Sequence, residues 1–138
     1  MPEPLLALGT LLAAAGAVWL WLVWRRHRTR RTGAQDLVLD YDVGRAGALV
    51  LAFTTPDCVP CKTVQRPALE SLERQFPGRI VMREIDALDA PHLARRFGIL
   101  TVPSTVVVGP DGEIRAINHG AATAERLARQ AGLNGQKG

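Results

Sequence analysis

The feature that most limits the fold of this chain is its N-terminal segment, residues 5–24, which contains no charged side chain. Helical residues rise by about 1.5 Å each, so a segment of this length extends about 30 Å, the thickness of a bilayer's hydrocarbon layer. Amphipathic rings favour the membrane–water interface, and the C-terminal end of the segment carries Trp19, Trp21 and Trp24. A buried core helix is usually shorter and shows a polar stripe. We therefore expect a transmembrane helix at residues 5–24, after a short tail at residues 1–4.

A basic stretch follows the apolar segment directly. Its cationic side chains are Arg25, Arg26, His27, Arg28, Arg30 and Arg31. Such a cluster stops translocation and, by the positive-inside rule, stays in the cytoplasm. We expect residues 25–35 to form a basic juxtamembrane linker in contact with anionic lipids, with the N-terminus outside and the soluble domain inside. A cleaved signal peptide fits poorly because no basic side chain precedes the apolar segment.

Outside the N-terminal segment the charges balance. The chain has 17 Lys plus Arg and 13 Asp plus Glu; residues 1–33 hold five of the basic and one of the acidic residues, so 12 of each remain. The net charge of +4 belongs to one short stretch, and we expect no nucleic-acid partner. A length of 138 residues allows one ordinary domain, which we place at residues 36–134, followed by a tail at residues 135–138.

Alternating strand and helix signals predict an α/β domain. We expect strands at residues 48–53, 79–85, 104–108 and 113–118, and helices at residues 60–76, 91–97 and 123–131. The first strand is a continuous apolar run, typical of a strand buried on both faces. In the helix that follows, Pro67 predicts a kink, and the apolar face is expected at Val64, Ala68, Leu72 and Phe76. Asp89 is expected to cap the second helix, and Thr123 to open the last.

Both cysteines fall in one C-x-x-C motif between the first apolar strand and the helix after it. A thiol at a helix N-terminus faces unpaired backbone N–H groups and the positive end of the helix dipole, which favour the thiolate. We expect Cys58 to be an exposed nucleophile. Cys61, one turn into the helix, is expected to be partly buried and able to close a disulfide with Cys58. Pro60 suits the first turn of the helix.

Three other roles for the pair are weaker. Half of a zinc site would need further ligands, and the chain has no other cysteine and only His27, His92 and His119. A structural disulfide across so short a loop would constrain the unfolded chain little. Two unrelated buried thiols would not lie among residues that mark an exposed turn, such as Asp57 and Lys62. We expect redox chemistry at this pair, without a metal or another cofactor.

Several segments, in register, resemble the thioredoxin family. Residues 53–62 are similar to its active-site segment and residues 97–104 to the segment with its cis-proline. Residues 111–113 are similar to its hairpin, and Gly120 to the glycine before its last helix. The resemblance covers about residues 44–132. It implies an α/β, thioredoxin-like fold, a central mixed sheet flanked by helices, preceded here by one transmembrane helix.

The resemblance also implies roles for the site residues. Cys58 is expected to attack a client disulfide, and Cys61 to resolve the mixed disulfide. Pro103 is expected to be the cis-proline, packed against the cysteines, and Val102 to offer backbone hydrogen bonds to an extended client segment. Further support is expected from the active-site residues Val59, Pro60 and Lys62.

The chain departs from the family pattern at several positions. Ala52 stands at the place of a buried aspartate, Met82 near that of a lysine, and Asp57 at that of a tryptophan. Val59 replaces a glycine, and Pro67 falls one residue later than the family's kink proline. A carboxylate beside Cys58 disfavours its thiolate. Loss of the buried acid implies slower proton transfer, or another base such as water.

These patterns predict an enzyme, a single-pass, membrane-tethered thiol–disulfide oxidoreductase. Its expected partners are protein disulfide clients, a thiol electron donor and, through residues 5–24, the membrane. In the cytoplasm, reducing conditions would favour the dithiol form. One alternative is an extracytoplasmic thioredoxin-like protein for cytochrome c maturation. Another is a low-turnover binding or scaffold module, which Ala52 and Asp57 favour.

Overall fold

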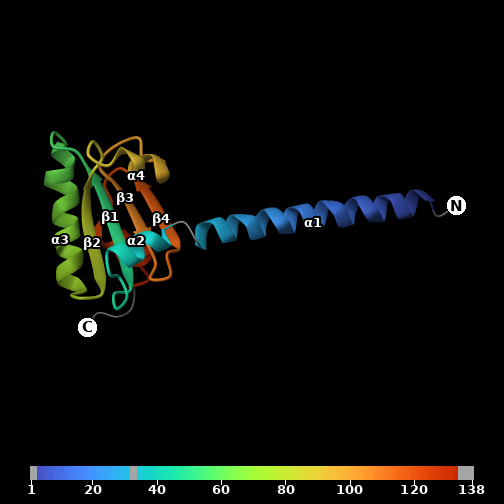
Figure 1. Ribbon diagram of the computed structural model, residues 1–138, viewed down its shortest axis with the longest axis horizontal. Coiled ribbons are helices and arrows are strands. Elements are labelled where there is room, and N and C mark those ends of the chain that lie inside the picture. The colour runs from blue at the N-terminus through green and yellow to red at the C-terminus, as the bar shows by residue number, and fades with distance from the viewer. Residues whose placement is uncertain (1–2, 32–33, 134–138) are drawn as a thin grey trace.

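A computed structural model describes residues 3–31 and 34–133. A long N-terminal helix leads into a domain in which helices cover both faces of one sheet (Figure 1). The elements in chain order are α1 (Glu3–Arg31), α2 (Gln35–Asp40), β1 (Ala48–Thr54), the π-helical turn η1 (Cys61–Gln65), α3 (Arg66–Gln75), β2 (Ile80–Asp86), α4 (Pro91–Arg96), β3 (Ser104–Val108), β4 (Ile114–His119) and α5 (Ala124–Gln130).

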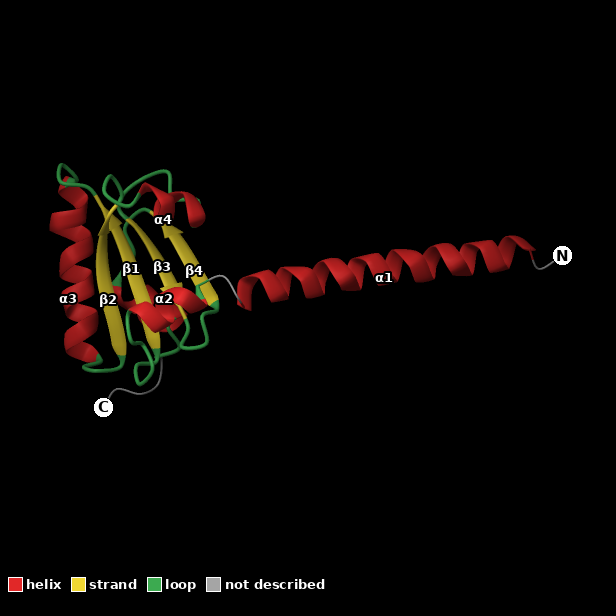
Figure 2. Ribbon diagram, in the orientation of Figure 1, coloured by secondary structure: helices red, strands yellow, loops and turns green. Residues whose placement is uncertain are grey.

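Helix α1 extends away from the domain as a single rod (Figure 2). Its apolar part, Glu3–Arg26, reaches a mean hydropathy of 2.0 and is not buried within the structure. By length and composition such a helix can cross a membrane or serve as a signal sequence. The Arg25 guanidinium lies 5.3 Å from the centre of the Trp21 ring. The helix begins inside the expected tail and continues through Arg31 into the expected linker; residues 32–33 and 134–138 lie outside the described part.

The expected mixed sheet is confirmed. Its strand order is β2-β1-β3-β4, with β1 parallel to β2 and the other two pairs antiparallel. Strand β1 is central, and alternate residues point to opposite faces. One set packs against α3 and α5, namely Ala48, Val50 and Ala52. The other packs against α2 and α4, namely Leu49, Leu51 and Phe53. Burial on both faces explains why the whole strand is apolar.

Of the two predicted N-terminal helix caps, one is wrong and the other is confirmed. Asp89 does not cap α4: the residue at the cap is Ala90, and its side chain makes no capping hydrogen bond. A neighbouring carboxylate, Asp86, shapes this turn instead by accepting a hydrogen bond from Leu88 N (2.8 Å). Thr123 opens α5 as expected, its hydroxyl oxygen accepting from Arg126 N (3.2 Å).

The expected helix at residues 60–76 is divided into η1 and α3. At the end of η1 the Arg66 N–H donates to Cys61 O, the carbonyl five residues earlier. In an α-helix it would donate to the carbonyl four residues earlier. Pro67 explains this, because its ring would clash with the carbonyl of Thr63 in a regular helix and it has no N–H to donate. The predicted disturbance at Pro67 therefore takes the form of a π-turn beside the cysteines.

The prediction that Val64 belongs to the apolar face of this helix is wrong. Val64 is 53% exposed. Residues at a constant spacing of four drift by about 40° per step around a helix, because one turn takes 3.6 residues. The face that is buried instead follows a mean spacing near 3.6 and comprises Cys61, Gln65, Leu69, Leu72 and Phe76.

Helix α2, which the sequence pattern does not predict, is held to α4 by an ion pair. Arg96 Nη1 and Nη2 donate to the Asp36 carboxylate at 2.7 Å each. These hydrogen bonds are the main reason why the pKa of Asp36 falls to about 2. Leu37 and Val38 of the same helix are buried under the sheet.

We expect this ion pair to make stability pH-dependent in acid. Because the pKa of Asp36 is lower in the folded state than the ordinary 3.8, the contribution is complete above pH 3.8 and is lost as the pH falls to about 2. The Asp36 side chain is 57% exposed, so the change Asp36→Ala should lower the free energy of unfolding by only about 0.5 kcal/mol at pH 7. Urea unfolding of both proteins from pH 2 to pH 7 checks this; a difference that does not shrink in acid would contradict it.

Candidate active site

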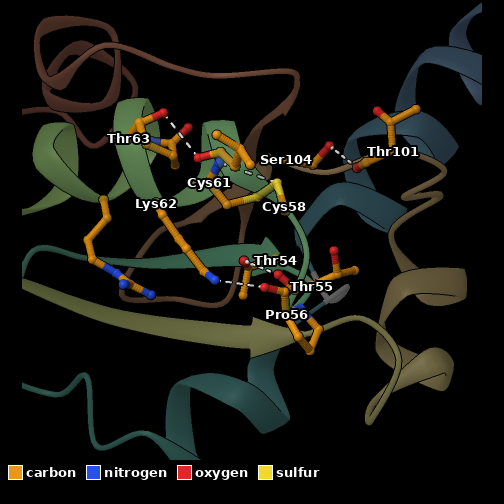
Figure 3. The surroundings of a disulfide bond; sticks show 12 residues. Thr54, Thr55, Pro56, Cys58, Cys61, Lys62, Thr63, Thr101 and Ser104 are labelled. Carbon is orange, nitrogen blue, oxygen red and sulfur yellow. Dashed lines mark hydrogen bonds between the residues drawn. A yellow bond between two sulfur atoms is a disulfide. The ribbon is translucent and has the colours of Figure 1, made fainter.

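The two cysteines form a disulfide at the junction of β1 and η1 (Figure 3). The bond joins Cys58 Sγ to Cys61 Sγ, with the two Cα atoms 5.3 Å apart. Strand β1 ends at Thr54, and the short turn after it is closed by a hydrogen bond from Cys58 N to Thr55 O (3.2 Å). Pro60 has the helical backbone angles that its ring favours. The Cys61 N–H then donates to Cys58 Sγ (3.3 Å), so an amide of the first helical turn points at this sulfur.

The expectation that Cys58 is exposed is wrong for the disulfide form. Cys58 is 8% exposed and Cys61 5%. The reason is that Cys61 lies on the buried face of the helix, and the short loop draws Cys58 in toward it. The two residues between them, Val59 and Pro60, are exposed to solvent, Val59 by 65%.

Two side chains after the cysteines brace the active-site turn. Lys62 Nζ donates to Pro56 O (2.8 Å), and Thr63 Oγ1 donates to Val59 O (3.0 Å), as Figure 3 shows for the lysine. Lys62 thus joins the helix to the far side of the turn. Asp57, the residue before Cys58, is exposed.

The Val102–Pro103 peptide bond is cis, as the resemblance implies, and lies at the same end of the sheet as the cysteines. Ser104, which follows it, is the cross-strand partner of Phe53, and β1 ends one residue later, at Thr54, before the turn that leads to Cys58. Ser104 Oγ donates to Thr101 O (2.7 Å), closing the loop (Figure 3). The fold therefore brings Val102 and Pro103 to the edge from which the C-x-x-C turn leaves.

The interior around Ala52 is apolar. Ala52 is 4% exposed and belongs to the same core cluster as Leu69, with Met82 packed against that cluster. Glu84, the β2 partner of Ala52, is half-exposed and bonded to Arg66, whose guanidinium lowers the pKa of the carboxyl. Within the described residues, the buried polar side chains are Gln65, Ser104 and Thr105, none of which is an acid or a base.

Gln65 is a residue of this region that the sequence pattern does not single out. It is 3% exposed, and its carboxamide bonds to the backbone of Ala122, 57 residues later. Its position four residues after Cys61 and four before Leu69 is the signal that could have placed it on the buried face. Across the described part of the chain, no group of three or more His, Cys, Asp or Glu side chains is arranged to hold a metal ion.

Comparison with known proteins identifies relatives of the domain. The thioredoxin family model matches residues 35–132. Chloroplastic thioredoxin M4 of Arabidopsis thaliana is 32% identical over 95 residues, which are 69% of this chain and 46% of that protein. Thioredoxin of Bacillus subtilis (strain 168) is 30% identical over 81 residues, or 59% of this chain and 76% of that protein. The chain spans roughly half the length of the plant relatives it matches.

Solved structures share the fold. The crystal structure of chloroplastic thioredoxin z superposes with a TM-score of 0.59 at 21% identity, over 72% of this chain and 88% of that one. Thioredoxin of Fasciola hepatica superposes with a TM-score of 0.58 at 21% identity, over 70% of this chain and 89% of that one. The likeness covers the sheet and its helices, the part that carries the cysteine pair.

Proposed function

The chain belongs to the thioredoxin family, and we propose that it is a membrane-tethered thiol–disulfide oxidoreductase acting on protein clients. The observation that carries the proposal is the Cys58–Cys61 disulfide at the start of a helix, with an amide N–H directed at Cys58 Sγ. A sulfur in this position gains from the partial positive charge of the helix N-terminus when it becomes a thiolate. The thioredoxins among its relatives support the same assignment.

The reaction we propose is two successive exchanges. In the reduced protein, the Cys58 thiolate attacks one sulfur of a client disulfide, forms a mixed disulfide and expels the other client sulfur as a thiolate. The Cys61 thiolate then attacks Cys58 Sγ, which closes the Cys58–Cys61 disulfide and releases the second client thiolate. The client gains two electrons and the protein loses two. A thiol donor restores the dithiol by the same exchange in reverse.

The neighbouring residues have supporting roles in this proposal. Lys62, through its bond to Pro56 O, keeps the active-site turn in place while Cys58 is attacked and released. We propose that the Val102 backbone binds an extended client segment and that the cis Pro103 supports the cysteine pair. Val59 and Pro60 form the exposed rim of the turn.

Proton transfer is the step at which this chain departs from its family. The described residues offer no buried acid or base near Ala52, so we propose that the Cys61 proton passes to water or to the departing client thiolate. Proton transfer without a positioned base loses a factor of roughly 10² or more. We therefore expect turnover to be slower than a site with such a base would support.

Tethering by α1 sets where the chemistry takes place. The basic residues after the uncharged residues 5–24, of which Arg25 and Arg26 are the first, favour a cytoplasmic domain. The reducing cytoplasm would keep the pair as a dithiol and make the protein a reductase. A reporter fused to the C-terminus tests this, since it should be active only inside; activity outside would move the domain to the extracytoplasmic side.

Trapping clients tests the chemistry. In the Cys61→Ser chain the mixed disulfide cannot be resolved, so we expect covalent adducts between Cys58 and client proteins that a reductant releases. The matched control is the Cys58→Ser, Cys61→Ser double variant, which should form none. Partners that bind both variants and survive reductant would point instead to a scaffold module.

A further inference from the structure

The buried side chain of Gln65 connects the helix that carries Cys61 to a distant backbone segment. Gln65 Nε2 donates to Ala122 O (3.1 Å), and Gln65 Oε1 accepts from Ala122 N (2.9 Å). The carboxamide thus satisfies both backbone groups of one residue, as a neighbouring strand would. Ala122 is 2% exposed, so water does not serve these groups in place of the carboxamide.

The segment held by Gln65 is itself bonded to the loop at Pro103. Gly120 N donates to Pro103 O (2.9 Å). Proline has no N–H, so this carbonyl is the one backbone hydrogen-bonding group of Pro103. Gly120 lies two residues before Ala122, and Thr123 directly after Ala122 caps α5. A continuous path therefore runs from the C-x-x-C helix through Gln65, Ala122 and Gly120 to the Pro103 carbonyl.

We propose that Gln65 is a positioning residue that sets the Val102–Pro103 backbone relative to the cysteine pair, for the binding of an extended client segment. The inference rests on the proposed function of the Cys58–Cys61 pair. The hydrogen bonds of the Gln65 carboxamide go to Ala122 and not to the sulfurs. Its effect on a client is therefore exerted through the backbone of residues 120–122. Loss of the carboxamide leaves the N–H and C=O of Ala122 buried without partners, which loosens this segment.

The inference separates two kinds of substrate. A small disulfide without a peptide backbone, such as hydroxyethyl disulfide, needs only access to Cys58. A disulfide within an extended peptide also needs the Val102 backbone in register. In the full chain in detergent micelles, the change Gln65→Met should raise KM for the peptide about tenfold and leave the rate with the small disulfide within about twofold. The matched control is Gln75→Met, since Gln75 is an exposed glutamine at the end of α3, the helix that continues from η1, and its Nε2 donates to Ser71 Oγ.

Amide hydrogen exchange measures the stability of the hydrogen bonds between Gln65 and Pro103 directly, without any need for catalytic turnover. We expect exchange at Ala122 and Gly120 to be at least about tenfold faster in Gln65→Met than in the wild type, and unchanged in Gln75→Met. Slow exchange at Val50 and Val107 in the core would show that the variant is folded.

The conservative variant Gln65→Glu distinguishes hydrogen bonding from simple packing, because protonation of the new side chain can restore the hydrogen bonds to Ala122. In Gln65→Glu the carboxylate can accept from Ala122 N but cannot donate to Ala122 O. A protonated carboxyl can do both. Burial raises the pKa of such a group. Mild acid should therefore restore the protection of Ala122, measured as its exchange rate relative to that of an unstructured amide at the same pH, in Gln65→Glu but not in Gln65→Met.

The outcomes that overturn the inference are distinct from failure of the proposed function. An equal fall in rate with both disulfides, an unchanged peptide KM, or a protection of Ala122 in Gln65→Glu that does not rise in acid would each overturn the positioning role. A folded wild-type chain that reduces neither substrate would refute the proposed oxidoreductase and with it the role in client binding.

Discussion

Replacing Cys58 by serine should lower disulfide reduction by the full chain at least about a thousandfold, to the rate of the thiol reductant alone. Cys58 Sγ accepts a hydrogen bond from the Cys61 N–H and directly follows the exposed turn, and we propose it as the sulfur that attacks a client. A serine hydroxyl in its place is hardly ionised at neutral pH and forms no exchangeable bond to sulfur. Catalytic residues that act together lose most of their rate enhancement when the nucleophile is removed. The measurement is reduction of a protein disulfide with dithiothreitol as donor.

The Cys61→Ser chain is the matched comparison, because it keeps the nucleophile and loses only the resolving step. Reduced beforehand and freed of dithiothreitol, it should react once and stall as the mixed disulfide, giving a burst of one client thiol per chain while the client stays attached; the wild type releases the client fully reduced. Equal steady rates for the wild type and Cys58→Ser would contradict the assignment of Cys58. A burst from Cys58→Ser but not from Cys61→Ser would exchange the roles of the two residues.

The change Ala52→Asp should destabilise the domain by about 3 kcal/mol at pH 8. Ala52 is 4% exposed, and its surroundings are the apolar side chains of the cluster that includes Val50 and Leu69. An ionised carboxylate placed there without a cation or a hydrogen-bond donor destabilises the folded state strongly, because it loses its hydration. The pKa of the introduced group must therefore rise above the usual 3.9 or so in the folded state.

The sign of the pH dependence follows from that rise. The unfolded chain releases the proton near pH 4 while the folded chain retains it, so the loss of stability grows as the pH increases from about 4 up to the raised pKa and then levels off. Urea unfolding of the full chain at pH 5 and pH 8 measures it. Ala52→Asn is the control, since it adds nearly the same volume without a charge and its cost should be independent of pH. A pH-independent loss in Ala52→Asp would mean that the position is solvated.

Elements with a strong local pattern could be predicted from the sequence. The continuous apolar run of β1, the β-branched run of β3 and the turn residues between β3 and β4 each identify an element by its own residues. Helix α2 could not be found this way, because its six residues are too few to show a period and, unlike the equally short α4 with Pro91 in its first turn, it has no such residue to mark its start. Its place depends on Arg96, 60 residues away, which bonds to Asp36.

The site shows the same division. The C-x-x-C motif and its position between strand and helix are visible in the sequence, and they predicted the disulfide chemistry. The burial of Cys58 was not visible, because it depends on which face of the following helix meets the sheet. The strictly four-spaced pattern led to Val64, whereas the helix buries Gln65.

What the sequence by itself determined is local: the apolar length of α1, the continuous apolar run that makes β1 central, and the cysteine pair at a helix start. These follow from the order of neighbouring residues, because periodicity, helix dipoles and turn chemistry act over a few residues. Only the tertiary structure decided which distant groups meet, as Gln65 does with Ala122 and Gly120 with Pro103. A hydrogen bond needs its two partners within about 3 Å, and nothing in the spacing along a chain specifies a partner many residues away.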